Sequence, residues 1–410
     1  MFRFDLTLSP LRSNPVRWAA SGMLAWWLGG LAHAYEPVAE VPPDFTMPKP
    51  LTLEQSMASL KVRPGLRVEL VAAEPLVADP INLDWGPDGK LWVVEMTDYP
   101  LGLDGKGQPG GRVRCLEDRD GDGKFETSTV FLDGLNFPTG VKAWRSGVIV
   151  LACPEILYAE DSDGDGKADL REVLYRGFRE GNQQHRVNGP EWGLDGWLHL
   201  ANGDSGGTVE SVKTGETLEL GSFDLAIEPD SGAMRLLTGR TQYGRVRDDV
   251  GNWFGCSNSR PIFQFLFRDA DLRRNPHAIY PPGNRDIDAG DDPRRVFPLS
   301  QGGQRYNDPD AENRFTSACG LAIYRDHRLG ESFYGNAFIC EPVHNLVSRR
   351  VLNADGLGFQ AVRTEDESGS EFLASSDHWF RPTAAKTGPD GALWVVDMHR
   401  YVIEHPEWIP

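Results

Sequence analysis

The sequence predicts an all-β fold, a six-bladed β-propeller, and three observations favour it. A Gly-rich turn followed by an apolar strand recurs along the 410 residues, most clearly at Trp85–Val94 (WGPDGKLWVV), Trp192–Leu200 (WGLDGWLHL) and Thr387–Val396 (TGPDGALWVV). Glycine and proline, with 45 and 29 residues, favour short strands joined by tight turns. The units recur at intervals of roughly fifty to sixty residues, which suits four short strands each, and a closed ring of them leaves few exposed sheet edges.

Six segments carry this unit: Pro80–Met96, Leu135–Tyr158, the strand after His185, Gly251–Phe267, Cys319–Val351 and Phe380–Met398. We therefore expect the propeller to occupy residues 64–410. Residues 268–316 are rich in Arg, Asp, Asn and Pro and lack the alternation, so they form an insertion in the fourth blade. Such an insertion either covers a functional site or is a flexible surface excursion.

The first 34 residues have the pattern of a secretory signal peptide. Arginines precede an apolar run at Trp18–Leu31, and Ala32-His33-Ala34 offers a cleavage site. We expect cleavage near Ala34 and a periplasmic or extracellular mature chain without a membrane span; the alternative is an uncleaved anchor, for which the run is short. Residues 35–63 read as a Pro-rich linker in which Thr52 and Gln55 have capping-box spacing for a short helix.

The charge and the cysteine content limit the classes of partner and cofactor to be expected. A net charge of −18 argues against nucleic acid, since phosphate binding needs a basic surface. The five cysteines include no C-x-x-C pair, so neither a zinc ribbon nor a haem attachment site is expected. Cys319 and Cys340 either pair across neighbouring strands or, like the others, are buried free thiols.

Two acidic loops have the spacing of calcium sites. The second fits the EF-hand loop register from end to end, because carboxylates occupy its oxygen-ligand places and glycine its sixth. Its ligands would be Asp161, Asp163, Asp165, Asp169 and Glu172. The first loop opens in the same way and would use Asp118, Asp120, Asp122 and, in place of a twelfth-position glutamate, Glu126. Either both loops bind Ca²⁺ and join strands, or they are solvated acidic turns.

His185 is the candidate for chemistry. It stands in a polar loop just before an inner strand, where a propeller presents side chains to its channel, and imidazole titrates near neutrality. It is either a general base or a loop histidine bonded to a neighbour. His199, inside the apolar strand, reads as a packed side chain. Arg381 precedes the last repeat in the same way, and arginine suits carboxylate recognition.

The chain resembles the propellers of glucose/sorbosone dehydrogenases, quinoproteins that use pyrroloquinoline quinone. It looks more closely like the secreted propeller module of membrane-bound dehydrogenases of Planctomycetes and their relatives, through PGLRVELVA at Pro64–Ala72, AEPLV at Ala73–Val77 and the closing Trp379-Phe380-Arg381-Pro382 with GPDGALWVVD. The closer family often continues into a helical repeat region and a c-type cytochrome domain. This chain ends at Pro410, so we expect a truncated gene or a fragment, and an external cytochrome c as electron acceptor.

The resemblance also implies site residues. His185, with Asn188 after it, corresponds to the catalytic histidine loop, and Arg381 to an arginine that binds the carboxylates of the quinone. Asn258 and His344 correspond to two further cofactor-binding positions, although Ser257 stands where the quinoproteins have arginine and His344 where they have lysine.

Three functions remain open at this point. The first is a secreted quinoprotein-like dehydrogenase that oxidises a sugar or related alcohol by hydride transfer to the quinone. The second is a non-catalytic, calcium-stabilised propeller that binds carbohydrate or protein. The third is a calcium-dependent lactonase-like hydrolase with a channel metal among residues such as Asn188, Asn202 and Asp204. A fold does not choose among them.

Overall fold

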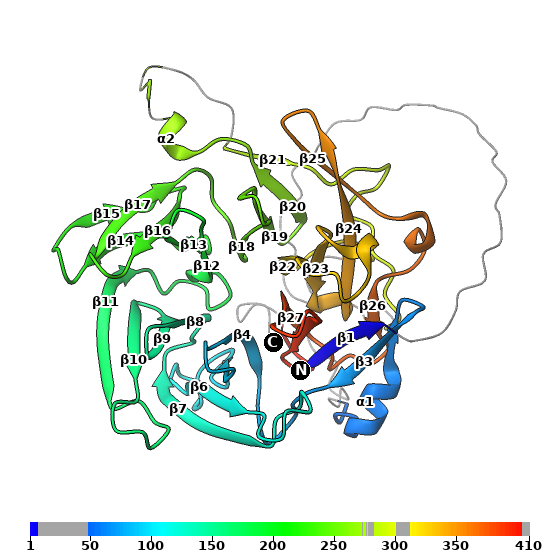
Figure 1. Cartoon of the computed structure of the whole chain (residues 1–410), viewed down its shortest axis with the longest axis horizontal. Coiled ribbons are helices and arrows are strands. Elements are labelled where there is room, and N and C mark those ends of the chain that lie inside the picture. The colour runs from blue at the N-terminus through cyan, green and yellow to red at the C-terminus, as the bar shows by residue number, and fades with distance from the viewer. Residues whose placement is uncertain (7–47, 273, 276, 278–282, 301–311, 404–410) are drawn as a thin grey trace.

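Six antiparallel sheets stand around one axis, as the computed structural model shows for residues 1–6, 48–272, 274, 275, 277, 283–300 and 312–403 (Figure 1). The predicted six-bladed propeller is therefore confirmed. Blade 1 consists of β4 (Pro80–Trp85), β5 (Leu91–Glu95), β6 (Gly111–Glu117) and β7 (Thr127–Leu135). Blade 2 consists of β8 (Gly140–Trp144), β9 (Gly147–Ala152), β10 (Glu155–Glu160) and β11 (Leu170–Phe178), extended by β14 (Gly207–Ser211) and β15 (Thr217–Glu219).

The other blades follow in chain order. Blade 3 consists of β12 (Asn188–Trp192), β13 (Leu198–Ala201), β16 (Asp224–Glu228) and β17 (Ala233–Leu237). Blade 4 consists of β18 (Arg245–Arg247), β19 (Trp253–Ser257), β20 (Arg260–Phe265) and β21 (Asn284–Asp286). Blade 5 consists of β22 (Cys319–Ile323), β23 (Ala337–Glu341), β24 (Leu346–Asp355), β25 (Gly358–Val362), β26 (Leu373–Ser375) and β2 (Leu60–Val62).

Blade 6 closes the ring with both ends of the described chain. Its order is β27 (Pro382–Thr387), β28 (Leu393–Asp397), β1 (Phe2–Leu6) and β3 (Leu66–Leu70). Helices are few among the described residues: α1 (Leu53–Ser59), α2 (Asp269–Leu272) and the 3₁₀ turns η2 (Glu331–Phe333), η3 (Pro342–His344) and η4 (Glu365–Glu367). None of these helices is long and apolar enough to cross a membrane.

The repeated motif forms the turn between the first two strands of a blade. In blade 1, Asp88 accepts a hydrogen bond from the Lys90 N–H at 3.2 Å, and Gly89 adopts a φ of 82°. Blade 6 repeats this, because Asp390 accepts from the Ala392 N–H at 3.1 Å and Gly391 has a φ of 78°. A side-chain acceptor and a residue that tolerates positive φ are what such a turn needs.

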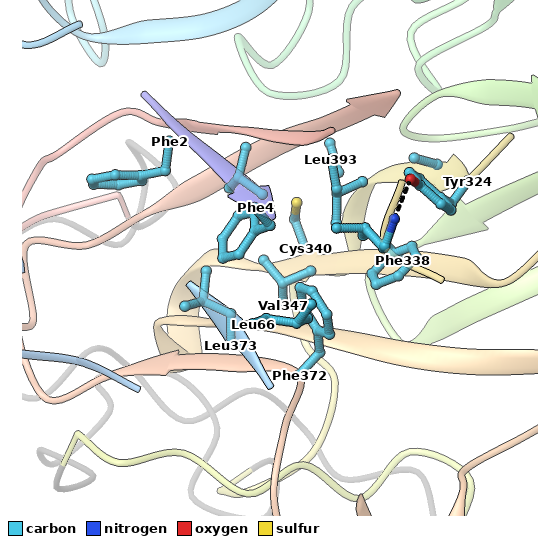
Figure 2. Packing of buried hydrophobic residues seen from close by; sticks show 14 of the residues in the cluster. Phe2, Phe4, Leu66, Tyr324, Phe338, Cys340, Val347, Phe372, Leu373 and Leu393 are labelled. Atoms are coloured by element: carbon cyan, nitrogen blue, oxygen red, sulfur yellow. Dashed lines mark hydrogen bonds between the residues drawn. The ribbon is translucent and has the colours of Figure 1, made fainter. Parts of the chain in front are cut away.

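Apolar clusters fill the spaces between neighbouring blades. Between blades 5 and 6, Phe4 and Leu393 pack toward Phe338 and Phe372, and all four are fully buried (Figure 2). The rings of Phe338 and Phe372 meet edge to face with centroids 4.8 Å apart. The hydroxyl of Tyr324 accepts a hydrogen bond from the Leu329 N–H at 3.1 Å, so this buried polar group has a partner.

Several segments differ from their predicted roles. The stretch from β14 to β15 follows blade 3's second strand but pairs with β11 of blade 2. Part of the predicted linker, β2, pairs with β26 in blade 5. The capping box at Thr52 and Gln55 is present as predicted at the start of α1. Residues 284–286, assigned to the insertion, are the fourth strand of blade 4.

The predicted signal peptide lies mostly outside the described residues, as do residues 35–47. Its first residues form β1, which pairs with β28 on one side and β3 on the other. The amino group of Met1 donates to the Ala72 carbonyl at 2.8 Å. Cleavage near Ala34 stays a prediction; a chain cleaved there lacks β1.

Replacing one large side chain in the cluster between blades 5 and 6 tests this packing. Phe338→Ala should lower the free energy of unfolding by about 3–5 kcal/mol, because it leaves a cavity among aromatic rings. The measurement is urea denaturation followed by tryptophan fluorescence. Leu357, which is 96% exposed in the β24–β25 turn, is the control: Leu357→Ala should change stability by less than about 0.5 kcal/mol. Equal effects of the two substitutions would contradict this account of the core.

Candidate functional site

The first strands of the six blades lie side by side around the axis. Contacts join β4 to β8, β8 to β12, β12 to β18, β18 to β22, β22 to β27 and β27 back to β4. Residues just before these strands therefore gather at one end of the channel, which we call the mouth. His185 precedes β12 and Arg381 precedes β27, so the structure places both predicted residues at the mouth.

His185 is half-buried and held by a neighbouring blade. Its Nε2 lies 2.9 Å from the Gln242 amide nitrogen, and the Gln242 oxygen accepts a hydrogen bond from the Asn258 N–H at 2.8 Å. Since the oxygen end of Gln242 faces Asn258, its NH₂ group donates to the imidazole. Nε2 must then be the acceptor, and in the neutral ring Nδ1 carries the hydrogen. The Tyr243 ring lies beside the imidazole, with centroids 6.0 Å apart.

A second polar group joins blade 1 and the last described residues to this side of the mouth. Gln184 donates to the Tyr99 hydroxyl at 2.8 Å and to the Ile403 carbonyl at 2.7 Å. The Tyr99 hydroxyl in turn donates to the Ile403 carbonyl at 3.0 Å. Loops from blades 1, 3 and 4 and the segment after β28 thus meet around His185.

The Arg381 guanidinium is occupied by the backbone. It donates to the carbonyls of Arg400 at 2.8 Å, Pro342 at 2.9 Å and Val343 at 3.4 Å, and also to the Tyr401 carbonyl. The side chain of Arg381 is buried, and the backbone N–H of Arg381 donates to the Asp397 carboxylate at 2.7 Å. Arg381 therefore ties η3 to the segment after β28, which differs from the predicted role of receiving a ligand carboxylate.

His344 and Asn188 are also committed to the fold. His344 is buried; its Nδ1 lies 3.1 Å from Glu341, and its Nε2 accepts from the Asn313 N–H at 3.1 Å. The Asn188 amide donates to the Gln242 carbonyl at 2.7 Å and accepts from the Gly244 N–H at 2.8 Å. The structure brings Asn258 next to Gln242, but through its backbone.

These contacts decide how well the predicted residues fit pyrroloquinoline quinone. A ligand with several carboxylates needs cationic donors aimed at it. Of the predicted positions, only Arg381 always carries a positive charge, and its N–H groups already meet carbonyls. The predicted residues, as the structure arranges them, are therefore not by themselves a set that fits the quinone.

The channel metal that a lactonase would need is not assembled by the residues predicted for it. The Asn202 amide donates to the Phe223 carbonyl at 2.8 Å, and Asp204 forms an ion pair with Arg240 at 2.8 Å. Asp204 and Asn188 are thus directed to protein partners, whereas the buried side-chain oxygen of Asn202 has no hydrogen-bond partner among the described residues. His199, in contrast, is packed as predicted: it stacks on Trp253 with ring centroids 4.1 Å apart.

The two acidic loops adopt the same conformation. Each first aspartate accepts two backbone N–H groups: Asp118 from Gly121 and Gly123, and Asp161 from Gly164 and Gly166. In the first loop, one oxygen from each of four carboxylates lies within 4.8 Å of the others, and these are the four predicted ligands, Asp118, Asp120, Asp122 and Glu126.

The second loop gathers fewer of its predicted ligands. Asp161, Asp163 and Asp165 meet the same distance criterion. Asp169 instead accepts hydrogen bonds from Ser162, at 2.7 Å from its N–H and 2.6 Å from its hydroxyl. Glu172 lies exposed on β11, since the chain continues as a strand where an EF-hand would continue as a helix.

The insertion packs on blade 5 where it is described. Asp288 forms an ion pair with Arg350 at 2.8 Å, and the Phe297 N–H donates to Glu371 at 3.0 Å. Residues 301–311 lie outside the described residues. A cavity of about 340 Å³ opens between this segment, β2 and residues 366–371, away from His185. The cysteines are all free thiols; Cys319 faces Cys340 in the register of β22 and β23.

Sequence reasoning missed Asp98, a buried carboxyl group in the loop after β5. Its Oδ2 accepts from the Phe137 N–H at 2.8 Å and the Gly110 N–H at 3.3 Å. Its Oδ1 has no hydrogen-bond partner among the described residues. Burial raises the pKa of Asp98, and the two N–H groups act against that rise. The Asp-Tyr-Pro sequence alone resembles an ordinary turn, so only the fold reveals this group.

Asp98 should make stability depend on pH in a defined direction. The pKa of Asp98 is higher in the folded chain than in the unfolded one. Between these two pKa values the folded state holds more protons than the unfolded state, so the free energy of unfolding falls as the pH rises. Asp98→Asn keeps this position uncharged, so its melting temperature should rise relative to the wild type from about pH 4 to pH 7. The exposed Asp133→Asn is the control. Parallel curves for wild type and Asp98→Asn would contradict the assignment.

Comparisons with known proteins agree with the fold. The holo PQQ domain of pyranose dehydrogenase from Coprinopsis cinerea matches with a TM-score of 0.50 and 14% identity, over 87% of this chain and 96% of that chain. An oxidoreductase described as a glucose dehydrogenase, from Thermus thermophilus, matches with a TM-score of 0.43 and 18% identity, over 85% and 97%. Another glucose dehydrogenase structure matches with a TM-score of 0.41 and 15% identity, over 79% and 95%. At these identities a likeness shows the fold alone.

Sequence comparison gives the family. No curated protein matches the chain. One family model, described as "Domain of unknown function (DUF7133)", matches residues 52–410. That range includes all the strands other than β1, and it also includes all the groups described at the mouth. The chain therefore belongs to the DUF7133 family.

Proposed function

We propose that this propeller binds a small hydroxyl-rich molecule, a sugar or related alcohol, at the mouth around His185. The observation that carries the proposal is the pairing of His185 with Gln242, whose amide is itself fixed by Asn258. The pairing holds a half-buried imidazole in one tautomer beside the Tyr243 ring. An aromatic face with a few fixed polar groups is how binding sites orient small polar ligands.

The chemistry of His185 follows from its tautomer. With Nε2 engaged by the Gln242 amide, the neutral ring carries its hydrogen on Nδ1. To act as a general base, the imidazole must first lose the Gln242 hydrogen bond and so expose Nε2. Proton abstraction by Nε2 therefore needs Gln242 to move.

Quinone-dependent dehydrogenation is the finer form of this proposal. It is supported by the sequence resemblance and by the shared fold of the pyranose dehydrogenase PQQ domain. The occupied N–H groups of Arg381 count against it, so we put binding first. The likeness to Planctomycetes dehydrogenases, secretion and an external cytochrome c acceptor stay predictions.

Equilibrium binding with matched histidine variants tests the proposal. Calorimetry against a panel of sugars and sugar alcohols should give binding to the wild type, and His185→Ala should weaken it about tenfold, the loss expected for one good hydrogen bond. His327→Ala is the control, because His327 is 60% exposed and stacks on Tyr334 in a loop of blade 5. If no sugar binds, or if both variants bind like the wild type, the proposal is wrong.

Added pyrroloquinoline quinone separates binding from oxidation in the same samples. Reduction of a redox dye that needs both sugar and quinone, and that His185→Ala abolishes, would establish the dehydrogenase. Sugar binding without any dye reduction would leave the binding function alone. Hydrolysis of a lactone without quinone would favour the hydrolase.

We also propose that the acidic loops bind Ca²⁺ as structural ions. The support is the convergence of the four carboxylates of the first loop, which are hard oxygen ligands suited to Ca²⁺. Ligand binding to the folded state alone raises its stability by mass action.

Calcium should therefore raise the melting temperature and chelator reverse the rise, with magnesium having less effect. Asp120→Asn should reduce the calcium effect, and the exposed Asp133→Asn should not; identical curves with calcium and chelator would exclude these sites.

A further inference from the structure

The residues that follow β28, 398–403, cross the mouth, and we call them the strap. The strap leaves blade 6 at His399, whose φ of 49° turns the chain away from the direction of β28. At its other end, the Ile403 carbonyl accepts hydrogen bonds from Tyr99 of blade 1 and from Gln184, in the loop before the first strand of blade 3. Blade 3 lies opposite blade 6 in the ring, so the strap passes over the channel.

Arginine side chains hold the half of the strap near blade 6. Arg381, in the loop before β27, donates to the carbonyls of Arg400 and Tyr401. The Arg400 side chain in turn forms an ion pair with Asp79, in the loop before β4, at 2.7 Å. It also donates to the Tyr99 carbonyl. This half of the strap is therefore tied to blade 6 by Arg381 and to blade 1 by Arg400.

The other half of the strap is fixed beside His185. Gln184, the residue before His185, donates to the Ile403 carbonyl at 2.7 Å and to the Tyr99 hydroxyl at 2.8 Å. The Tyr99 hydroxyl donates to the same carbonyl at 3.0 Å. One carbonyl of the strap thus accepts donors from two blades, next to the histidine on which the proposed binding function depends.

Side-chain contacts, rather than a β-ladder, hold the strap in place. Residues 398–403 belong to no strand or helix, although the Met398 N–H donates to the Arg381 carbonyl at 2.9 Å. A segment held in this way opens at a lower free energy than a strand paired on both sides. The strap can therefore open while the six blades stay folded.

We propose that the strap is a lid that controls access to the imidazole of His185. Opening breaks the contacts of Ile403 and Arg400 with blades 1 and 3, whereas Arg381 keeps the strap attached to blade 6. The nature of the molecule admitted, a sugar or related alcohol, rests on the proposed function. The movement of the strap is measured by the reactivity of His185, which needs no sugar.

Chemical modification of His185 in the full chain measures this opening. Diethyl pyrocarbonate acylates neutral imidazole nitrogens, and peptide mass spectrometry gives the rate at each histidine. If the strap covers His185, the rate there is proportional to the open fraction. His327, which is 60% exposed in a loop of blade 5, is the reference in the same sample.

Two substitutions loosen the strap at separate points. Tyr99→Phe removes a donor to the Ile403 carbonyl. Arg400→Met removes the ion pair with blade 1 and acts on the strap away from the His185 loop. Each variant should raise the rate at His185 about fivefold, the change in the open fraction expected when one hydrogen bond is lost. If Arg400→Met does not fold, Asp79→Asn weakens the same ion pair from the other side.

Arg285→Met is the matched control. It also removes an ion pair, with Asp355 at 2.9 Å, but this pair joins outer strands of blades 4 and 5, so the rate at His185 should not change. An unchanged rate at His185 in Tyr99→Phe or in Arg400→Met would overturn the proposal. A parallel rise at His327 would indicate general loosening and would overturn it too. If the two variants expose His185 and yet no sugar binds, the strap stands and the proposed function is wrong.

Discussion

Closure of the ring is the constraint on which the rest of the structure depends. Each blade buries its apolar side chains against the next, so no blade has a complete core of its own. Blade 6 completes the circle only because strands distant in sequence, β3 and β28, lie on either side of β1. The mouth exists because closure brings the starts of six first strands into one circle. The arrangement of the mouth is thus a property of the whole ring.

The same closure explains why polar groups at the mouth differ in availability. Loops that leave the sheets expose carbonyl groups, and buried carbonyls need donors. Arg381 and Asn188 meet that need, which makes them parts of the frame. His185 instead contacts a side chain, Gln242, and side-chain partners can be exchanged at less cost to the backbone. This difference separates the residues that hold the mouth together from His185, on which the proposed binding function depends.

The fold was largely predictable from sequence, because its signals are local. The Gly-Pro-Asp-Gly turns and the apolar strands after them depend on residues within ten positions of one another. The pairing of β14 and β15 with blade 2 was not predictable, since their polar alternation fits any sheet edge. The strand β1 was missed for a similar reason: arginines and apolar residues at an N-terminus match a leader pattern equally well.

The sequence predicted where His185 and Arg381 lie, but not the partners of Arg381. Sequence spacing put His185 and Arg381 before first strands, and the structure puts both at the mouth. Whether a guanidinium faces a ligand or four carbonyls depends on loops far away in sequence, such as η3 and the segment after β28. Asp98 could not be recognised from the sequence for the same reason, because its burial and its partner Phe137 depend on the folded structure.

The position of β1 in blade 6 links the structure of that blade to proteolytic maturation. Met1 is buried, and burial lowers the pKa of its amino group to about 6. Proteolytic maturation near Ala34 would remove a strand whose backbone bonds both β28 and β3, and would leave those two edges without their shared neighbour. Precursor and mature forms would then differ in the backbone hydrogen bonds of blade 6, since only the precursor contains β1 between β28 and β3. The amide hydrogens of Leu393–Asp397 would report which form is present.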